Sequence, residues 1–151
     1  MVPTGKIGNI TWHRIVEAEG PEFDINFLLP DAPAEAINAH RDWMEPRFLE
    51  PGTNKLIMAT QSYLLRTLHH NILIDTCVGN DKERRFYPPW SGQSGTTFVD
   101  NLHATGLYVD DIDFVICTHL HADHVGWNTR LLEGCWVPTF PNARYVFAKS
   151  E

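Results

Sequence analysis

The sequence predicts an α/β (α+β) fold in which helices pack against a mixed β-sheet. Two apolar segments, residues 71–76 and 111–118, have the composition of buried strands, and a helical pattern over residues 96–106 separates them. A dense group of polar side chains follows the second of these strands directly. Because loops at the carboxyl ends of strands often carry functional residues, we expect the site at this edge of the sheet.

The first third of the chain alternates between regular and interrupted sequence. Residues 9–17 are rich in β-branched and aromatic side chains and predict a first strand. Residues 18–54 contain prolines at five positions, so long regular elements are not expected there. A short helix over residues 33–43 fits this segment, with the proline at its first turn. We interpret residues 18–54 as an irregular, Pro-rich segment that covers the substrate.

The remaining elements follow from local periodicity. Residues 55–76 predict a β-hairpin with a tight turn at residues 69–71, between its two apolar runs. In the helix over residues 96–106, Phe98 and Leu102 are four positions apart and share one face. A last strand is expected over residues 143–150.

Composition and charge narrow the classes of function. A chain of 151 residues with 43% hydrophobic and 21% charged residues predicts one ordered domain over residues 1–151. The net charge is −7 and the basic residues are scattered, which argues against a nucleic-acid partner. The sequence contains neither an apolar run long enough to span a bilayer nor a signal-peptide core, so we expect no membrane association and a cytoplasmic location.

The segment THLHADHVGW contains the most informative cluster of the sequence: His119, His121, Asp123 and His124. In an extended segment, residues two apart point to the same side, so the first two imidazoles can face one point while the last two side chains face a second point nearby. Zinc accepts imidazole nitrogen and carboxylate oxygen, as do Mn, Fe and Co less selectively. Histidines placed by chance, or a loop hydrogen-bonded to itself, are the structural alternative, which the spacing and the strand context disfavour.

The same residues resemble a known family. HLHADH matches the H-x-H-x-D-H motif of the metallo-β-lactamase superfamily, and NILIDT resembles the early strand of that fold, which ends in Asp. The resemblance extends over residues 56–151, and within the superfamily it is strongest for lactonase-type hydrolases, including quorum-quenching lactonases. It implies the first half of a metallo-β-lactamase αββα sandwich, with a mixed sheet and helices on one face.

The resemblance also implies a role for each residue of the cluster. His119 and His121 would hold a first divalent metal ion, while Asp123 and His124 would hold a second. Asp123 would also be catalytic, since it could carry a proton to the leaving group. The expected cofactors are therefore two divalent metal ions, with zinc preferred and Mn, Fe or Co as alternatives.

Five further residues are candidates for supporting roles. Asp75, at the end of a buried strand, would orient the metal-binding loop by hydrogen bonds, and Thr118 would help similarly. From the residues alone, a turn or helix-capping role for Asp75 is equally open. Trp43, Trp90 and Trp127 could line an apolar substrate pocket, with core packing as the alternative for each.

The family pattern also requires ligands downstream of the motif: a further His, a bridging Asp or its equivalent, and a final His. The sequence has no His and no Asp after His124. We therefore expect this chain to be an N-terminal half that is inactive when isolated. It would be either a fragment that lacks its C-terminal half or a chain that a complementing chain completes.

The expected function is a zinc-dependent dinuclear hydrolase in which a metal-bound hydroxide attacks a lactone or a related carboxylic ester. The alternative is an incomplete, catalytically inactive half-domain that binds metal weakly or associates with a complementing chain. Metal content and turnover distinguish the two hypotheses.

Overall fold

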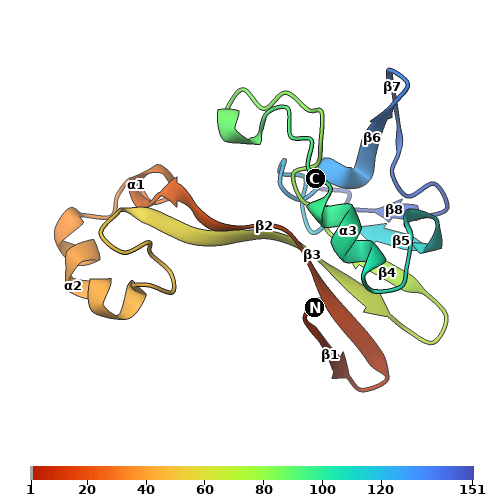
Figure 1. The fold of residues 1–151 in the computed structure, drawn as a ribbon, viewed down its shortest axis with the longest axis horizontal. Helices are drawn as coiled ribbons and strands as arrows, with labels where there is room; N and C mark the ends of the chain where they lie inside the picture. The colour runs from red at the N-terminus through yellow and green to blue at the C-terminus, as the bar shows by residue number, and fades with distance from the viewer. Residues whose placement is uncertain (1) are drawn as a thin grey trace. The chain divides into compact units, whose positions relative to one another are not determined.

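A computed structural model describes residues 2–151 of the chain (Figure 1). Eight strands, three α-helices and three 3₁₀ turns are formed in these residues. In chain order they are β1 (Thr4–Ile7), β2 (Ile10–Asp24), α1 (Ile25–Leu28), α2 (Ala34–Met44), β3 (Lys55–Arg66), β4 (Asn71–Ile74), η1 (Pro88–Trp90), α3 (Thr97–His103), η2 (Val109–Asp111), β5 (Phe114–Ile116), η3 (Gly126–Asn128), β6 (Thr129–Leu132), β7 (Cys135–Pro138) and β8 (Arg144–Val146). No helix among the described residues has the length and apolarity that a bilayer crossing requires.

The chain folds into two compact units. The first comprises the described part of Met1–Glu17 together with Thr60–Glu151, and the second comprises Ala18–Ala59. Strands β2 and β3 contribute residues to both units. The segment expected to be irregular, residues 18–54, therefore lies within a unit of its own, and it contains more regular structure than its prolines suggested.

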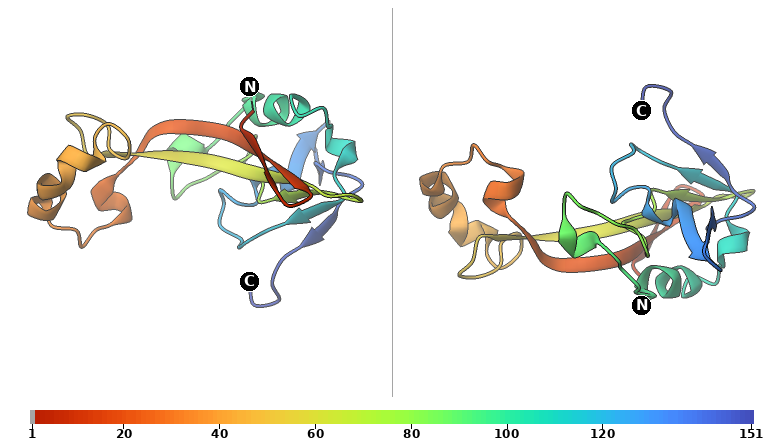
Figure 2. Two further views of the ribbon diagram at one scale, coloured as in Figure 1. Left: turned by 90° about the horizontal axis from the view of Figure 1, so that it is seen from below. Right: turned by 90° about the horizontal axis from the view of Figure 1, so that it is seen from above.

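The first unit contains the mixed sheet that the sequence predicted. The strand order of the six-stranded sheet is β1-β2-β3-β4-β5-β8, and a separate two-stranded sheet joins β6 to β7. Strand β4 is antiparallel to β3 and parallel to β5, which is in turn parallel to β8. Helix α3 lies on one face of this sheet (Figure 2). Because β4 and β5 are parallel neighbours, the loops that follow them start at the same edge.

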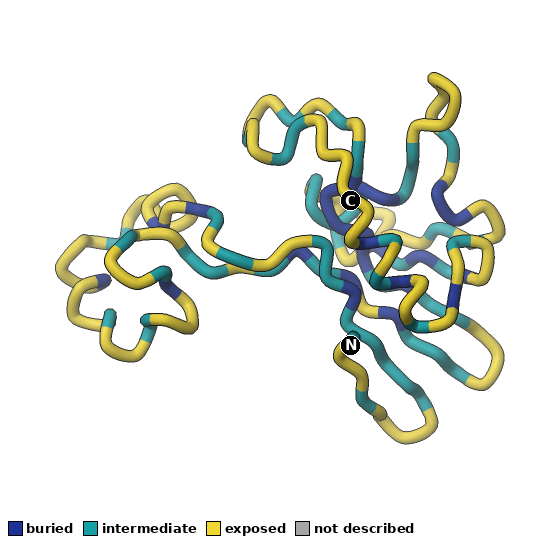
Figure 3. Tube along the Cα trace, in the orientation of Figure 1, coloured by how far each residue is buried: buried dark blue, intermediate teal, exposed yellow. Residues whose placement is uncertain are grey.

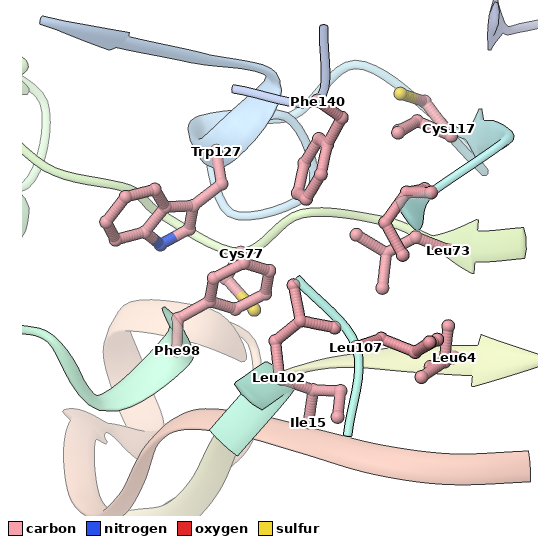
Figure 4. Packing of buried hydrophobic residues seen from close by; sticks show 12 residues of the cluster. Ile15, Leu64, Leu73, Cys77, Phe98, Leu102, Leu107, Cys117, Trp127 and Phe140 are labelled. Atoms are coloured by element: carbon pink, nitrogen blue, oxygen red, sulfur yellow. The ribbon is translucent and has the colours of Figure 1, made fainter. Parts of the chain in front are cut away.

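A single hydrophobic core holds α3 against the sheet. Phe98 and Leu102 of α3 are fully buried, as their spacing predicted, and they pack against side chains from β2, β3 and β4 (Figure 4). Buried residues of the first unit are concentrated around this contact and in the loop after β4 (residues 75–79), whereas the tip of the turn between β3 and β4 is exposed (Figure 3). The buried members of the core are Ile15, Leu64, Leu73, Cys77, Phe98, Leu102, Leu107, Ile112, Val115, Cys117, Trp127 and Phe140.

The second unit has a small core of its own, formed by Ile25, Ile37 and Leu49. The helix expected over residues 33–43 is confirmed as α2, with Pro33 as the residue before its first turn. The Arg41 side chain fixes this helix, because its guanidinium donates to the Glu45 carboxylate at 2.7 Å and to a backbone carbonyl of the loop before β3 at 2.8 Å.

The β-hairpin expected over residues 55–76 is confirmed, but its turn lies earlier than predicted. Arg66 pairs with Asn71, so the connection comprises residues 67–70 rather than 69–71. The Thr67 hydroxyl oxygen accepts hydrogen bonds from the backbone N–H groups of His69 and His70, at 3.2 and 2.9 Å. A threonine at the start of the turn therefore determines its position.

Candidate metal centre

Asp75 and Thr118 meet where the parallel strands β4 and β5 end. The Thr118 backbone N–H donates to Asp75 Oδ1 at 2.8 Å, and the Thr118 hydroxyl donates to Asp75 Oδ2 at the same distance. Asp75 Oδ2 also lies 2.9 Å from Nδ1 of His124. One buried carboxylate therefore connects the end of β4, the start of the histidine loop and the last residue of the motif.

The four predicted metal ligands lie in one cluster. The ring centroid of His119 is 4.7 Å from that of His121 and 3.9 Å from that of His124. Asp123 Oδ2 lies 3.3 Å from His124 Nε2. The loop therefore brings three imidazoles and one carboxylate together, rather than spreading them over the surface.

The donor chemistry of this cluster fits a divalent metal ion. Asp75 contacts Nδ1 of His124, and the Thr118 hydroxyl lies 3.1 Å from Nδ1 of His119. Ligating histidines are typically held at one ring nitrogen in this way, which leaves the other nitrogen for the metal. Within residues 2–151, however, no three His, Cys, Asp or Glu side chains surround a common point closely enough to hold an ion.

The loop after β4 has an unusual backbone. Asp75 and Cys77 have φ angles of 59° and 53°, in the left-handed region that residues with a Cβ rarely adopt. Such conformations persist where the surroundings fix them, and they are concentrated at functional sites. Here the backbone N–H of Thr76 donates to the His124 carbonyl at 2.8 Å, and the Gly126 N–H donates to the Cys77 carbonyl at 2.7 Å. The loop that carries Asp75 is thus bonded directly to the loop that carries His124.

These two loops touch through their glycines. A Cβ on Gly126 would lie 1.9 Å from the backbone carbonyl of Val78, and a Cβ on Gly79 would lie 2.4 Å from the backbone of Gly126. Both positions therefore exclude any side chain, since backbone on the opposite side cannot rotate away.

Two basic side chains of the loop between β4 and α3, Lys82 and Arg84, contact backbone carbonyls on or near the two loops of the site. An Arg84 Nη2 group donates to the Val78 carbonyl at 3.3 Å and is 3.5 Å from the Ala122 carbonyl. Burial lowers the pKa of Arg84, and the Asp123 carboxylate opposes that shift. Lys82 donates to the Thr129 carbonyl at 2.8 Å, and burial, followed by the charge of Arg84, lowers its pKa to about 8.

The three tryptophans occupy different environments. Trp127 is only 6% exposed and stacks on Phe98 at a centroid distance of 5.3 Å, so it belongs to the core, the alternative considered for it. Trp90 packs edge-on against Tyr87, 5.2 Å away. Trp43 is 61% exposed in the second unit.

Replacing Asp75 by asparagine should weaken zinc binding by about 10–100-fold, the usual effect of losing a partner that orients a ligand. An amide NH₂ facing His124 would donate a hydrogen bond to Nδ1, so the single proton of the neutral imidazole would lie on Nε2 and block that nitrogen as a ligand. Zinc affinity measured by competition with a chromophoric chelator tests this expectation. Asp113→Asn is the matched control, because Asp113 accepts from Asn71 N–H at 2.7 Å near the opposite ends of β4 and β5. An equal loss of zinc affinity in both variants would contradict the role of Asp75 in orienting His124.

Comparisons with known proteins identify the family. The model of the metallo-beta-lactamase superfamily matches residues 58–151. The N-acyl homoserine lactonase AiiB of Agrobacterium fabrum is 26% identical over 99 residues, which cover 60% of this chain and 36% of the relative.

Solved structures show the same fold. AidC, described as a dizinc quorum-quenching lactonase in complex with a product, has a TM-score of 0.73 at 20% identity, with 95% of this chain and 43% of AidC covered. A probable metal-dependent hydrolase from Staphylococcus aureus has a TM-score of 0.69 at 24% identity, with 93% of this chain and 47% of that protein covered. The chain thus spans less than half the length of each of these relatives. From the family match and the arrangement of its histidine loop, this chain belongs to the metallo-beta-lactamase superfamily.

Proposed function

We propose that the protein carrying this sequence is a dinuclear, zinc-dependent hydrolase of lactones or related carboxylic esters. The observation that carries the proposal is the cluster of three imidazoles and one carboxylate, oriented by Asp75 at the edge of the sheet. The family match and the relation to a lactonase support it.

In this proposal each side chain of the cluster has a defined task. His119 and His121 would bind one metal ion, and Asp123 and His124 would bind the other. When bound, such ions lower the pKa of a coordinated water and polarise the carbonyl of the substrate. Asp123 would accept the proton of the attacking water and pass it to the alkoxide that leaves. Arg84, beside the Ala122 carbonyl, would keep the loop that carries Asp123 in place.

The substrate-binding surface is proposed from the loop between β4 and α3. Trp90 contacts both Phe86 and Tyr87, at centroid distances of 6.0 and 5.2 Å, and the three rings form an aromatic group on this loop. An apolar surface of this kind suits an acyl chain, whereas the polar cluster suits the ester group.

A second candidate function is weak metal binding without catalysis. The observation that favours it is that no three metal-donor side chains surround a common point among the described residues. In that case the protein would bind at most one ion, with low affinity, because zinc sites usually use three or four protein ligands.

One assay separates the two candidates. Hydrolysis of an N-acyl homoserine lactone releases one proton per ring opened, so a weakly buffered pH indicator reports turnover directly. In the complete protein that carries this sequence, we expect zinc-dependent turnover that a chelator abolishes and that added zinc restores. Zinc binding without turnover of lactones or chromogenic esters would favour the second candidate, and turnover that survives complete chelation would contradict the metal-dependent mechanism.

A further inference from the structure

The carboxylate of Glu17, a half-buried residue of β2, accepts three hydrogen bonds from N–H groups. Its Oε2 accepts from the backbone N–H of Val78 at 2.8 Å. Its Oε1 accepts from the backbone N–H of Gly79 at 3.1 Å and from the indole Nε1–H of Trp127 at 2.6 Å. Hydrogen bonds to a carboxylate are stronger than those between neutral groups, so this side chain holds its three donors firmly in place.

The three donors belong to the two loops of the candidate metal centre. Val78 and Gly79 continue the strained segment that begins at Asp75, and Trp127 lies three residues after His124. The donors are 61, 62 and 110 residues away from Glu17 along the chain. A single side chain from β2 therefore joins the loop with Asp75 to the loop with His124.

We propose that Glu17 is a positioning residue for the metal centre and acts through Val78, Gly79 and Trp127. By fixing the backbone after Cys77, it keeps the left-handed turn in the one conformation from which Asp75 Oδ2 reaches His124 Nδ1 at 2.9 Å. The inference rests on the proposed function, since it assigns Glu17 a task in metal binding and not only in folding.

The variant that tests this role is Glu17→Gln, which keeps the shape of the side chain. A glutamine has one oxygen acceptor, and its NH₂ group donates, so at least one of the three N–H groups faces another donor. We expect zinc affinity to fall by about 10-fold or more, within the range for partners that orient ligands. In the metal-free protein we expect faster hydrogen exchange at the Val78 and Gly79 amides and a changed ¹⁵N shift at His124 Nδ1.

Ile15→Val is the control for a loss of stability alone. Ile15 is a fully buried residue of the same strand, and its side chain has no polar atom that could bond the loops. Zinc affinity is measured by chelator competition at a temperature at which both variants are folded. We expect Ile15→Val to lower the unfolding temperature but to keep the zinc affinity and the His124 shift of the unmodified protein.

The outcomes separate this inference from the proposed function. Unchanged zinc affinity and an unchanged His124 shift in Glu17→Gln, with a stability loss like that of Ile15→Val, would overturn the positioning role. If Glu17→Gln does not fold, Trp127→Phe replaces it, because phenylalanine removes one donor and retains an aromatic ring against Phe98. Trp127→Phe should weaken zinc binding relative to the unmodified protein, by less than the about 10-fold expected for loss of the whole carboxylate, and no effect would again overturn the role. An unmodified protein that binds no zinc would instead refute the proposed function.

Discussion

Replacing His121 by alanine is expected to abolish both metal binding and hydrolysis in the protein that carries this sequence. His121 lies 4.7 Å, between ring centroids, from His119, and these two imidazoles are the proposed ligands of one ion. Removing a ligand directly should cost more than the about 10–100-fold loss that follows removal of a partner that only orients one. Zinc content after gel filtration, together with the rate of lactone opening, provides the measurement.

The control for this variant is His69→Ala. His69 is an exposed residue of the connection between β3 and β4, and it lies outside the histidine cluster. We expect the control to retain zinc and turnover. Full activity in His121→Ala would contradict the metal mechanism.

Replacing Gly126 by alanine should lower the free energy of unfolding by about 3 kcal/mol, the upper end of the usual range for overpacking. The new Cβ would lie 1.9 Å from the Val78 carbonyl and 2.5 Å from that of Cys77, and both neighbours are backbone. The two loops must therefore separate, which also breaks the 2.7 Å hydrogen bond from the Gly126 N–H. Chemical denaturation measures the loss, and a lower zinc affinity should accompany it.

Gly95→Ala is the matched comparison for Gly126→Ala. A Cβ at Gly95 would meet nothing within 4 Å, and its φ lies outside the left-handed region. We expect this variant to be as stable as the unmodified protein or slightly more stable, because alanine reduces the conformational entropy of the unfolded chain. If the two variants have equal stability, the tight contact between the loops is not present in solution.

Local periodicity predicted most of the regular elements. The hairpin of β3 and β4, helix α2, helix α3 with its buried Phe98 and Leu102, and the strand before the histidine loop are all present. Strand β5 is shorter than the expected range of residues 111–118, since η2 occupies its start and Thr118 turns toward Asp75. Strand β2 continues beyond the expected residue 17, to Asp24, as part of the second unit.

The candidate site was predictable where its residues are close in sequence. His119, His121, Asp123 and His124 lie within six positions, so their proximity follows from one loop. The contact of Asp75 with this loop followed from two strands that end at the same edge.

Contacts between distant segments left no such local signal. Glu17 is one glutamate in a strand pattern, and nothing in its neighbourhood indicates that it bonds a loop 61 residues later. Trp127 adjoins the motif, yet its ring packs in the core because Phe98 of α3 stacks against it. Tertiary packing decides where such side chains lie, and the periodicity of the sequence carries no information about contacts between distant segments.

The most direct test of the central claim is zinc K-edge X-ray absorption on the zinc-loaded protein. We expect nitrogen and oxygen neighbours at about 2.0–2.2 Å with the outer-shell scattering of imidazole, since His119, His121 and His124 are the proposed nitrogen ligands. Sulfur neighbours at about 2.3 Å would instead place the ion at a cysteine thiolate. That result, or a protein that retains no zinc, would contradict the assignment of the histidine loop as the metal centre.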